Sequence, residues 1–382
     1  GAQVIKTIHV ISDSNIGGAG RYLLTYLRNC DTKQFDVSVA VPENSLLIPE
    51  IEALGFVHYE IKGLAEATFS REALKDLKKL FRKEKPDLVH THACLSARIA
   101  ARLTGVKTIV YTRHSVFAPD KHLTTPWARF MHRLADKFLS TGIIAVAEAA
   151  KKNVTDTGIS PDKVKVIYNG IDAPAVLSED KKAEVRKQLG IPEGVPVISI
   201  IARLTAVKGH RYFIEAAEIL KMMGVKAAFV IAGTGEEEPA LKKYAEEKFL
   251  GDTVIFAGFL EKVYELENVT DIQVNASYGT EAASLSLLEG MSLGIPAVVS
   301  DFGGNPELIT SGVNGYVVPQ KSAQAIAEHV YKLLSDKKLY GEISKCSKMI
   351  FEQKFTAAIM TKNMEDYYLS MINKKEGGEV NG

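Results

Sequence analysis

The sequence predicts an α/β protein built from two doubly wound, parallel-sheet domains. Short β-branched runs alternate with amphipathic helical patterns along the chain, which is the rhythm of right-handed β–α–β crossovers. A turn- and charge-rich stretch near Asn169–Gly194 separates two such series. The length of 382 residues also suits two or three domains of roughly 150 residues each.

The first series lies in residues 1–170, which we predict to form the N-terminal, Rossmann-like domain. Its short β-branched runs predict the strands Ile5–Ile11, Val37–Val41, Leu88–His90, Thr108–Tyr111, Gly142–Val146 and Lys165–Ile167. Apolar residues at helical spacing predict the intervening helices Gly20–Arg28, Arg71–Arg82, Ser96–Leu103 and Pro126–Phe138.

The second series lies in residues 195–355, after a predicted linker at 171–194, and forms the predicted C-terminal domain. Its expected strands are Val195–Ile201, Ala227–Ala232, Val254–Ala257, Asp271–Asn275, Pro296–Ser300 and Gly315–Val318. Its expected helices are Arg211–Met222, Glu237–Lys248, Leu285–Leu293 and Ala323–Leu334. A last helix follows over Thr356–Ile372, and Lys374–Gly382 is expected to be a frayed tail.

Composition excludes several classes of protein. With 46% hydrophobic and 24% charged residues, the chain has the mixture of an ordinary soluble globular protein. No apolar stretch approaches the roughly 18 residues of a membrane span. Three scattered cysteines and the lack of a signal-peptide pattern favour a reducing, cytoplasmic location over a disulfide framework. The basic residues do not match a nucleic-acid-binding module, so no nucleic acid partner is expected.

Charge is distributed unevenly between the two halves. Residues 1–175 carry 24 Lys and Arg against 18 Asp and Glu, whereas residues 176–382 carry 23 against 28. A basic N-terminal half suits an anionic partner such as a phospholipid surface or a polyprenyl phosphate. Lys-rich helix faces that are simply solvated explain the same count equally well. The helical stretch Arg71–Lys85 is the candidate for peripheral membrane attachment.

A glycine-rich loop follows the first predicted strand. Glycines such as Gly17 and Gly18 let backbone amides approach a phosphate at a helix N-terminus. The loop lacks the third glycine of a dinucleotide fingerprint, and the second strand ends at Val41-Pro42 without an acidic residue. These departures disfavour NAD, and a tight turn without a ligand remains an alternative.

Two cations follow the strand Val195–Ile201. Arg203 and Lys208 lie five residues apart on one strand-to-helix loop and could converge on a diphosphate, Arg as a planar fork and Lys as a point charge. Solvated surface cations are the alternative. Ligands of open parallel sheets bind at such loops, at the carboxyl ends of strands.

Two glutamates flank the start of the predicted helix Leu285–Leu293. Glu281 precedes the helix and Glu289 lies about 12 Å further on, at 1.5 Å per helical residue. Carboxylates accept hydrogen bonds from sugar hydroxyls, while the helix N-terminus at Ala283, Ser284 and Leu285 suits phosphates between them. The simpler alternative to a ligand site is that Glu281 is only a negative charge at the helix N-terminus and that Glu289 is a surface residue.

Histidines end two strands of the first half. His114 is a candidate for contact with a sugar or phosphate, although a lone histidine is more often structural. His90 and His92 alternate in one strand, but the sequence supplies neither a third ligand nor a DxD carboxylate pair beside them. We therefore expect no metal site.

Several of these motifs, taken in order, resemble the signature of family 4 glycosyltransferases. The resemblance covers essentially the whole chain and is strongest from 165 to 320. Its segments are Ile167–Asp172, Ala202–Gly209, Glu281–Ser300, Gly303–Glu307 and Asn314-Gly315.

The resemblance implies a GT-B fold: two Rossmann-like domains facing a cleft, with the C-terminal helix, about 356–373, returning to the first domain. It implies metal-independent sugar transfer from a UDP or GDP donor with retention of configuration, in polysaccharide or glycolipid biosynthesis. Arg203 and Lys208 would neutralise the donor diphosphate, Glu281 and His114 would contact the donor sugar, and Glu289 would bind the ribose hydroxyls.

The remaining predicted binding residues also follow from the resemblance. Gly17 and Gly18 match the glycine loop near the phosphates and the acceptor, while Gly233, Gly258 and Phe259 match segments that border the nucleotide base. No cofactor is expected besides the nucleotide-sugar donor. The acceptor is open, with a lipid-linked glycan at a membrane surface as one candidate.

One departure from the family pattern affects the choice of sugar. Many members have Gly or Ser, then Phe and Gly, after the first glutamate, whereas this chain has Ala282-Ala283-Ser284. The wall beside the donor sugar therefore differs. A nucleotide-sugar epimerase or sugar phosphorylase on the same architecture, and a non-catalytic two-lobed binding protein, are the competing interpretations.

Overall fold

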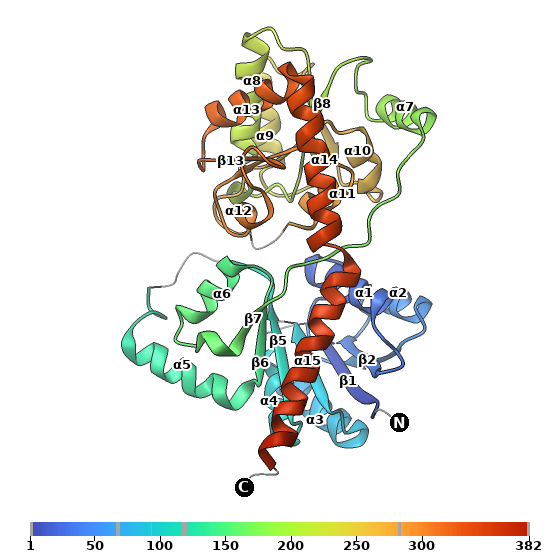
Figure 1. Cartoon of the computed structure of the whole chain (residues 1–382), viewed down its shortest axis with the longest axis vertical. Helices are drawn as coiled ribbons and strands as arrows, with labels where there is room; N and C mark the ends of the chain where they lie inside the picture. The colour runs from blue at the N-terminus through green and yellow to red at the C-terminus, as the bar shows by residue number, and fades with distance from the viewer. Residues whose placement is uncertain (1–2, 66–68, 93, 117–120, 282–283, 380–382) are drawn as a thin grey trace. The chain divides into compact units, whose positions relative to one another are not determined.

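The structure is a computed structural model that describes residues 3–65, 69–92, 94–116, 121–281 and 284–379 (Figure 1). The chain divides into two compact units. Unit 1 is built mainly from the chain up to Gly170 together with the segment from Ala357 onward, and unit 2 mainly from Ile171–Thr356. Each unit contains one parallel sheet with helical crossovers, which confirms the predicted fold class.

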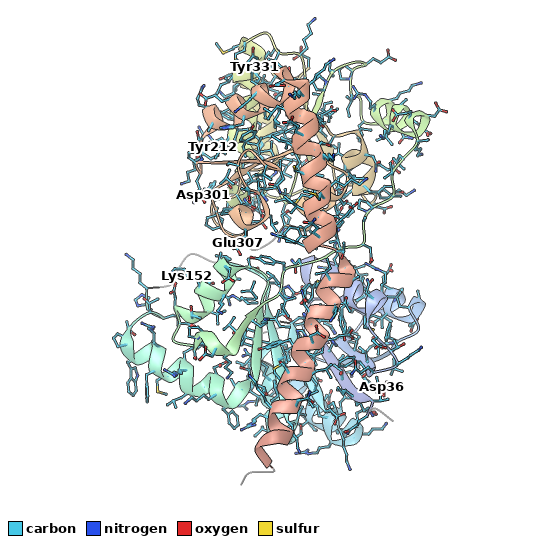
Figure 2. The ribbon with its side chains drawn as sticks, viewed as in Figure 1. Asp36, Lys152, Tyr212, Asp301, Glu307 and Tyr331 are labelled. Carbon is cyan, nitrogen blue, oxygen red and sulfur yellow. The ribbon has the colours of Figure 1, made fainter. Side chains whose placement is uncertain are left out.

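The described residues of unit 1 form a seven-stranded sheet in the order β3-β2-β1-β4-β5-β6-β7. The strands are β1 (Ile5–Ile11), β2 (Phe35–Pro42), β3 (Val57–Ile61), β4 (Leu88–His92), β5 (Thr108–Arg113), β6 (Gly142–Ala145) and β7 (Val164–Val166). Sequence reasoning missed β3, because this edge strand is largely exposed and mixes polar with apolar residues. Asp36 of β2 likewise points outward from unit 1 (Figure 2).

The helices of unit 1 cover the sheet, and their apolar faces form its core. They are α1 (Gly18–Asn29), α2 (Ile48–Ala53), α3 (Arg71–Glu84), α4 (Leu95–Leu103), α5 (Pro126–Leu139), α6 (Glu148–Thr155) and α15 (Ala357–Glu379). Ile8 of β1 and Val89 of β4 pack with Leu77 of α3 and Ala97 of α4 in one buried cluster. Burial of a side chain the size of leucine stabilises the fold by roughly 1.5–3 kcal/mol.

Helix α15 belongs to unit 1 although it follows unit 2 in sequence. Its Met364 accepts a hydrogen bond from Tyr22 of α1, with 3.3 Å between Tyr22 Oη and Met364 Sδ. A Cβ at Gly142 would lie 2.3 Å from Tyr367 Oη and 2.5 Å from Met371 Sδ, so a larger residue there would displace these side chains of α15. The predicted frayed tail is wrong for residues 374–379, which continue the helix.

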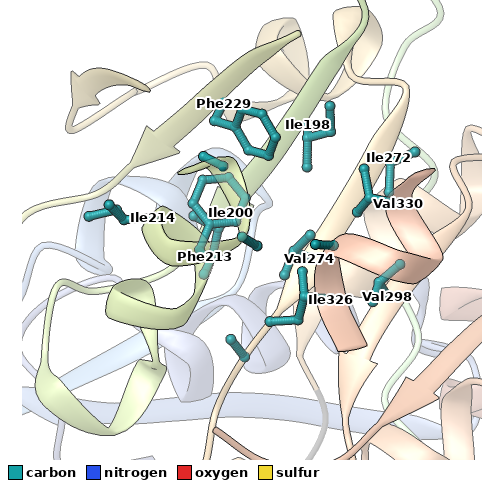
Figure 3. Close-up of a cluster of buried hydrophobic side chains, with 14 of the residues drawn as sticks. Ile198, Ile200, Phe213, Ile214, Phe229, Ile272, Val274, Val298, Ile326 and Val330 are labelled. Carbon is teal, nitrogen blue, oxygen red and sulfur yellow. The ribbon is translucent and has the colours of Figure 1, made fainter. Parts of the chain in front are cut away.

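The described residues of unit 2 form a six-stranded sheet in the order β10-β9-β8-β11-β12-β13. The strands are β8 (Val197–Ile201), β9 (Ala228–Ala232), β10 (Val254–Gly258), β11 (Ile272–Asn275), β12 (Ala297–Ser300) and β13 (Gly315–Val318). Ile200, Phe213, Val274 and Val330 lie in its buried core (Figure 3). Apolar strands covered by helices are typical of parallel sheets.

The helices of unit 2 include several that the sequence reasoning did not predict. The helices are α7 (Glu179–Gln188), α8 (His210–Met222), α9 (Glu238–Glu247), α10 (Val263–Val269), α11 (Leu285–Ser292), α12 (Asn305–Leu308), α13 (Ala323–Ser335) and α14 (Lys337–Lys354). Helix α7 lies inside the predicted linker and starts at the capping residue Ser178. Helix α14 was not predicted, because it buries only a narrow stripe of residues and so shows a weak apolar periodicity. The buried residues are Ile343, Ser347 and Phe351.

Candidate active site

Lys208 and Glu281 meet at the carboxyl edge of the unit 2 sheet. Lys208 ends the short 3₁₀ helix η2 (Ala206–Lys208) that follows β8, and Glu281 precedes α11. Lys208 Nζ lies 3.2 Å from Glu281 Oε2 and donates to the carbonyl oxygen of Thr280 at 3.0 Å. The side chains are 20% and 11% exposed, so water screens this ion pair less than it screens a surface pair.

The Glu281 carboxylate is also held by two neutral donors. Asn275 Nδ2, at the end of β11, and Ser277 Oγ each donate to Glu281 Oε2 at 3.2 Å. Three donors therefore converge on one oxygen, and no donor among the residues that the structure describes reaches Glu281 Oε1. A carboxylate fixed through one oxygen presents the other as an acceptor for a ligand hydroxyl.

Two glycines bring the loops around this ion pair into contact. Gly209 has φ +74°, and a Cβ there would lie 2.1 Å from the carbonyl oxygen of Ala276. Gly303 has φ +56°, and its Cβ would lie 1.8 Å from the carbonyl oxygen of Glu281. Both positions combine a left-handed backbone with a close backbone approach, so both require glycine. The loops that carry Lys208 and Glu281 are thus positioned by close approaches that only glycine allows.

Arg203 lies on the same loop as Lys208 but has a different environment. It is exposed, and within the described ranges no acidic side chain pairs with it. Leu204, next to it, is buried and donates its amide to the carbonyl oxygen of Thr234 at 2.9 Å. The structure therefore anchors the backbone beside Arg203 and leaves its guanidinium free to bind an anion.

Helix α11 begins beside this site. Ser284 caps it, because Ser284 Oγ accepts a hydrogen bond from the amide of Leu287 at 3.3 Å. The amide of Leu285 lies in the first turn, where helix amides have no intrahelical partner. Glu289 is buried on α11, at 7% exposure, which rules out the simpler interpretation of a surface residue. Ala283 and its neighbour Ala282 lie outside the described residues.

The predicted nucleotide loops meet at the ends of β9 and β10. The amide of Gly233 donates to the carbonyl oxygen of Gly258 at 2.8 Å. A Cβ at Gly233 would lie 2.0 Å from the carbonyl oxygen of Ala202, which links this pair of loops to the one that carries Arg203. Phe259 follows Gly258 and is 73% exposed, so its ring is available to a ligand.

The glycine loop of unit 1 ends at the start of α1. Gly17 is the N-cap and Gly18 the first residue of the helix. Cβ atoms at these positions would meet no described atom within 4 Å, and neither residue has a positive φ. Gly20 differs, because its Cβ would press on Leu47 at 3.1 Å. Packing inside unit 1 therefore explains Gly20 but not Gly17 or Gly18.

His114 lies at one end of a row of histidines. Its Nε2 lies 3.1 Å from Nδ1 of His92, and Nε2 of His92 lies 3.4 Å from Nδ1 of His9. Burial lowers the pKa of His9 to about 3 and that of His114 to about 4, and holds the pKa of His92 well below its usual value. Neutral imidazoles each have one donor and one acceptor nitrogen, so the row couples the tautomers of all three.

The third histidine of a candidate metal cluster is His9, which the sequence reasoning did not connect with His90 and His92. Ligand atoms of these three residues lie within 4.8 Å of one another. The rings of His90 and His92 are stacked, however, with centroids 4.5 Å apart and planes 13° from parallel. His90 also engages both ring nitrogens, with Thr112 Oγ1 at 2.5 Å and with Tyr368 Oη. Since ligand lone pairs lie in the ring plane, parallel rings do not converge on one ion.

Sequence reasoning also missed two polar residues near the Lys208–Glu281 pair, Asn305 on the side of Glu281 and His210 on the side of Lys208. Asn305 donates from Nδ2 to Asn275 Oδ1 at 3.2 Å and to the carbonyl oxygen of Ser300, and so holds Asn275 in place. His210 is 2% exposed with both ring nitrogens unpaired among the described residues, and burial lowers its pKa to about 4. Asn275 lies at the end of a predicted strand, and Asn305 lies after a turn. A polar residue at such a position is a signal from which sequence reasoning could have predicted a site residue.

Comparison with known proteins shows the same organisation. Residues 16–173 match glycosyltransferase family 4, and residues 181–349 match the group 1 glycosyl transferases. An uncharacterised glycosyltransferase of Methanocaldococcus jannaschii is 30% identical over 314 residues, covering 76% of this chain and 78% of the relative. An Escherichia coli UDP-Gal:α-D-GlcNAc-diphosphoundecaprenol α-1,3-galactosyltransferase is 27% identical, covering 97% of this chain and 98% of that protein.

Solved structures agree on the fold. The Anabaena protein HepE, crystallised with UDP and glucose, superimposes with a TM-score of 0.82 at 19% identity, covering 96% of this chain and all of that one. A glycosyltransferase from Rickettsia africae gives 0.83 at 18% identity, covering 97% and 99%. The two parallel-sheet units, the ordered motifs and these relatives together show that the chain is a GT-B glycosyltransferase and belongs to glycosyltransferase family 4.

Proposed function

We propose that this protein transfers a sugar from a uridine diphosphate sugar to a hydroxyl group of a polyprenyl-diphosphate-linked glycan. The transfer retains the anomeric configuration and needs no metal ion. The observation that carries the proposal is the Lys208–Glu281 pair, which places a cation beside a carboxylate with one unclaimed oxygen. A sugar diphosphate has the matching groups, hydroxyls next to a dianionic bridge.

Charge stabilisation in the proposed reaction comes from residues of unit 2. Departure of the nucleoside diphosphate builds negative charge on its oxygens, and preorganised cations and helix amides lower the energy of that state. Lys208 is fixed by Glu281 and Thr280, and the α11 N-terminus lies after Glu281 in the chain. Arg203, exposed and without an acidic partner among the described residues, supplies the second cation.

The proposed bond changes balance without a side-chain base. The bond between the sugar C1 and the diphosphate oxygen breaks, and a bond from the acceptor oxygen to C1 forms on the same face. The acceptor's hydroxyl proton passes to the departing phosphate oxygen. His114, whose pKa is lowered to about 4 by burial, is neutral at pH 7 and acts as a hydrogen-bonding contact to the sugar.

Sugar recognition in this proposal depends on the two glutamates. Glu281 Oε1 accepts from donor sugar hydroxyls, while Glu289 accepts from the ribose. The exposed ring of Phe259, beside the contact of Gly233 with Gly258, borders the uracil. Gly17 and Gly18 leave room for the phosphates and the acceptor. This role agrees with the finding that packing inside unit 1 does not require glycine at either position.

The choice of donor and acceptor rests on the relatives' names. The E. coli relative is named for UDP-galactose and a diphosphoundecaprenol acceptor, and the Anabaena structures contain UDP. Another relative, from Bacillus anthracis, is an N-acetyl-α-D-glucosaminyl L-malate synthase, 24% identical over 78% of this chain and of that protein, so small acceptors also occur. Coverage of nearly the full length by the E. coli relative favours the lipid-linked acceptor.

A product assay tests the proposal directly. Purified protein is incubated with UDP-galactose, UDP-glucose, UDP-N-acetylglucosamine or GDP-mannose, in EDTA or in Mg²⁺, with and without a short-chain GlcNAc-diphosphoprenol. We expect a glycosylated product from a UDP-sugar, at equal rates in EDTA and Mg²⁺, with an α linkage by NMR. Product only with Mg²⁺, an inverted linkage, or an epimerised donor without acceptor would each contradict a stated part of the proposal.

A further inference from the structure

Helix α5 (Pro126–Leu139) exposes an apolar face that the rest of the described chain does not cover. Its outward residues are Trp127, Phe130, Met131, Leu134 and Phe138, at 72%, 54%, 46%, 47% and 48% exposure. Large apolar side chains gathered on one exposed helix face mark an interaction surface, whereas scattered ones do not.

The inner side of α5 is attached to unit 1 through a buried ion pair, which holds the apolar face outward. Asp136, the residue on α5 that is buried, pairs with Lys163 Nζ at 2.6 Å and accepts from Ser140 Oγ at 2.7 Å. At about 100° per residue, the five apolar residues form one stripe on the side opposite Asp136. The attachment to unit 1 therefore fixes the apolar stripe in the outward orientation.

Basic residues border the apolar stripe. Arg129, Arg133 and Lys137 recur at every fourth residue along α5, and all three are exposed. Arg102 of α4 places its guanidinium over the Phe138 ring, 5.4 Å from the centroid. The single acid of the helix, Asp136, is neutralised by Lys163. The exposed surface of α5 thus combines aromatic and aliphatic side chains with three cations and no exposed acid.

We propose that α5 attaches the protein to an anionic membrane by lying in the lipid–water interface. An apolar stripe of Trp, Phe and Leu bordered by Lys and Arg is the pattern of interfacial helices, and their cations pair with anionic headgroups. No helix among the described residues is long and apolar enough to cross a bilayer. A second copy of the chain is a poorer occupant, because pairing α5 with itself would bring two rows of cations together.

The topology connects this attachment with the reaction. Helix α5 ends at Leu139, close in sequence to the start of β6 at Gly142, so its C-terminus lies at the amino edge of the parallel sheet. Its N-terminus with Trp127 therefore lies toward the carboxyl edge, where β5 ends and His114 follows. Delivery of a lipid-linked acceptor to that edge rests on the proposed function, whereas the membrane attachment itself does not.

Trp127 allows a direct test, because it is the one tryptophan of the chain. Tryptophan emission is recorded with phosphatidylcholine vesicles that contain either no or 40% phosphatidylglycerol, at low and at 0.5 M salt, and with brominated lipids as quenchers. With anionic vesicles we expect a blue shift, quenching by brominated lipid and co-sedimentation, all weakened by salt. Emission that does not change with anionic vesicles would overturn the proposal.

The double variant Phe130→Ser/Phe138→Ser keeps Trp127 and removes two inserted rings. At about tenfold per buried phenylalanine, vesicle affinity falls by about 100-fold. The matched control, Met222→Ser/Phe249→Ser, removes two exposed apolar residues of unit 2, at 82% and 85% exposure, and keeps full affinity. Equal losses in both variants, or a concentration-dependent dimer that shifts Trp127 without lipid, would refute membrane attachment.

A soluble acceptor separates this proposal from the proposed function. Phe130→Ser/Phe138→Ser is expected to transfer sugar to a short-chain acceptor in solution at the parent rate and to lose rate only with acceptor embedded in anionic vesicles. If the variant and the parent protein had equal rates on vesicle-embedded acceptor, membrane attachment through α5 would have no role in the transfer reaction. Loss of activity on both acceptors, with vesicle binding intact, would place α5 in the reaction and not at the membrane.

Discussion

Acid should destabilise unit 1 more steeply than its surface charges would suggest, because three histidines are buried without charge. His9, His90 and His92 are at most 1% exposed, and burial lowers the pKa of His9 to about 3 and holds those of His90 and His92 well below the usual range. In the unfolded chain a histidine titrates near 6.5. Below that pH the unfolded state binds protons that the folded state does not accept.

The direction and size of the effect follow from linkage. The stability is fully present above about pH 6.5 and is lost as the pH falls below it, by about 1.4 kcal/mol per pH unit for each histidine. At pH 5 His9 and the neighbouring His114, with pKa values lowered to about 3 and about 4, each cost about 2 kcal/mol, and His90 and His92 add to the loss in the same direction. Glu365, whose pKa burial raises to about 6, acts in the opposite sense and offsets about 1 kcal/mol. The net loss is therefore at least about 3 kcal/mol, which is a large fraction of the stability of a domain.

Hydrogen exchange on peptides from β1 and β4 measures the opening free energy of unit 1 between pH 8 and 5, after correction for the intrinsic exchange rate. His9→Phe should reduce the slope below pH 6.5 by about 1.4 kcal/mol per pH unit. Phe35→Leu, an uncharged change in the same core, should lower stability equally at every pH. A flat profile in the parent, or an unchanged slope in His9→Phe, would refute buried neutral histidines.

Three further predictions concern the site in unit 2. Lys208→Ala should reduce kcat by roughly 10²-fold or more, measured by initial rates, because it removes charge stabilisation of the leaving diphosphate; an unchanged kcat in a folded variant would exclude this role. Glu289→Gln should raise the KM for the UDP-sugar with little change in kcat, and a selective loss of kcat would contradict a ribose contact. Gly303→Ala should lower activity and the melting temperature together, since its φ of +56° and its 1.8 Å approach to the Glu281 carbonyl exclude a Cβ; parent-like values of both would show that the loop can relax.

Much of the fold could be read from local pattern. Buried strands such as β1 and β8 are short, β-branched and apolar, and the helices between them follow their expected periodicity. The edge strand β3 and helix α7 could not be read in this way, because neither has a continuous apolar face. Their positions depend on neighbours that are distant in sequence.

The candidate site likewise has some features that local sequence pattern predicts and others that depend on residues distant in sequence. The order of the motifs along the chain marked Lys208 and Glu281, but their contact joins residues 73 positions apart and depends on close approaches at Gly209 and Gly303. His9 lies in the interior of a strand and carries no local signal, and only the pairing of β1 with β4 brings it beside His90 and His92.

Helices α3 and α5 separate most clearly what the sequence by itself determined from what tertiary structure decided. Both are amphipathic and basic, and periodicity predicted both as helices. Periodicity does not say against what a face packs. Helix α3 buries Leu77 and Phe81 against the sheet, whereas α5 is attached through the Asp136–Lys163 pair and turns Trp127 and Phe130 outward. A local pattern defines a face, but the partner surface decides whether water, protein or lipid covers it.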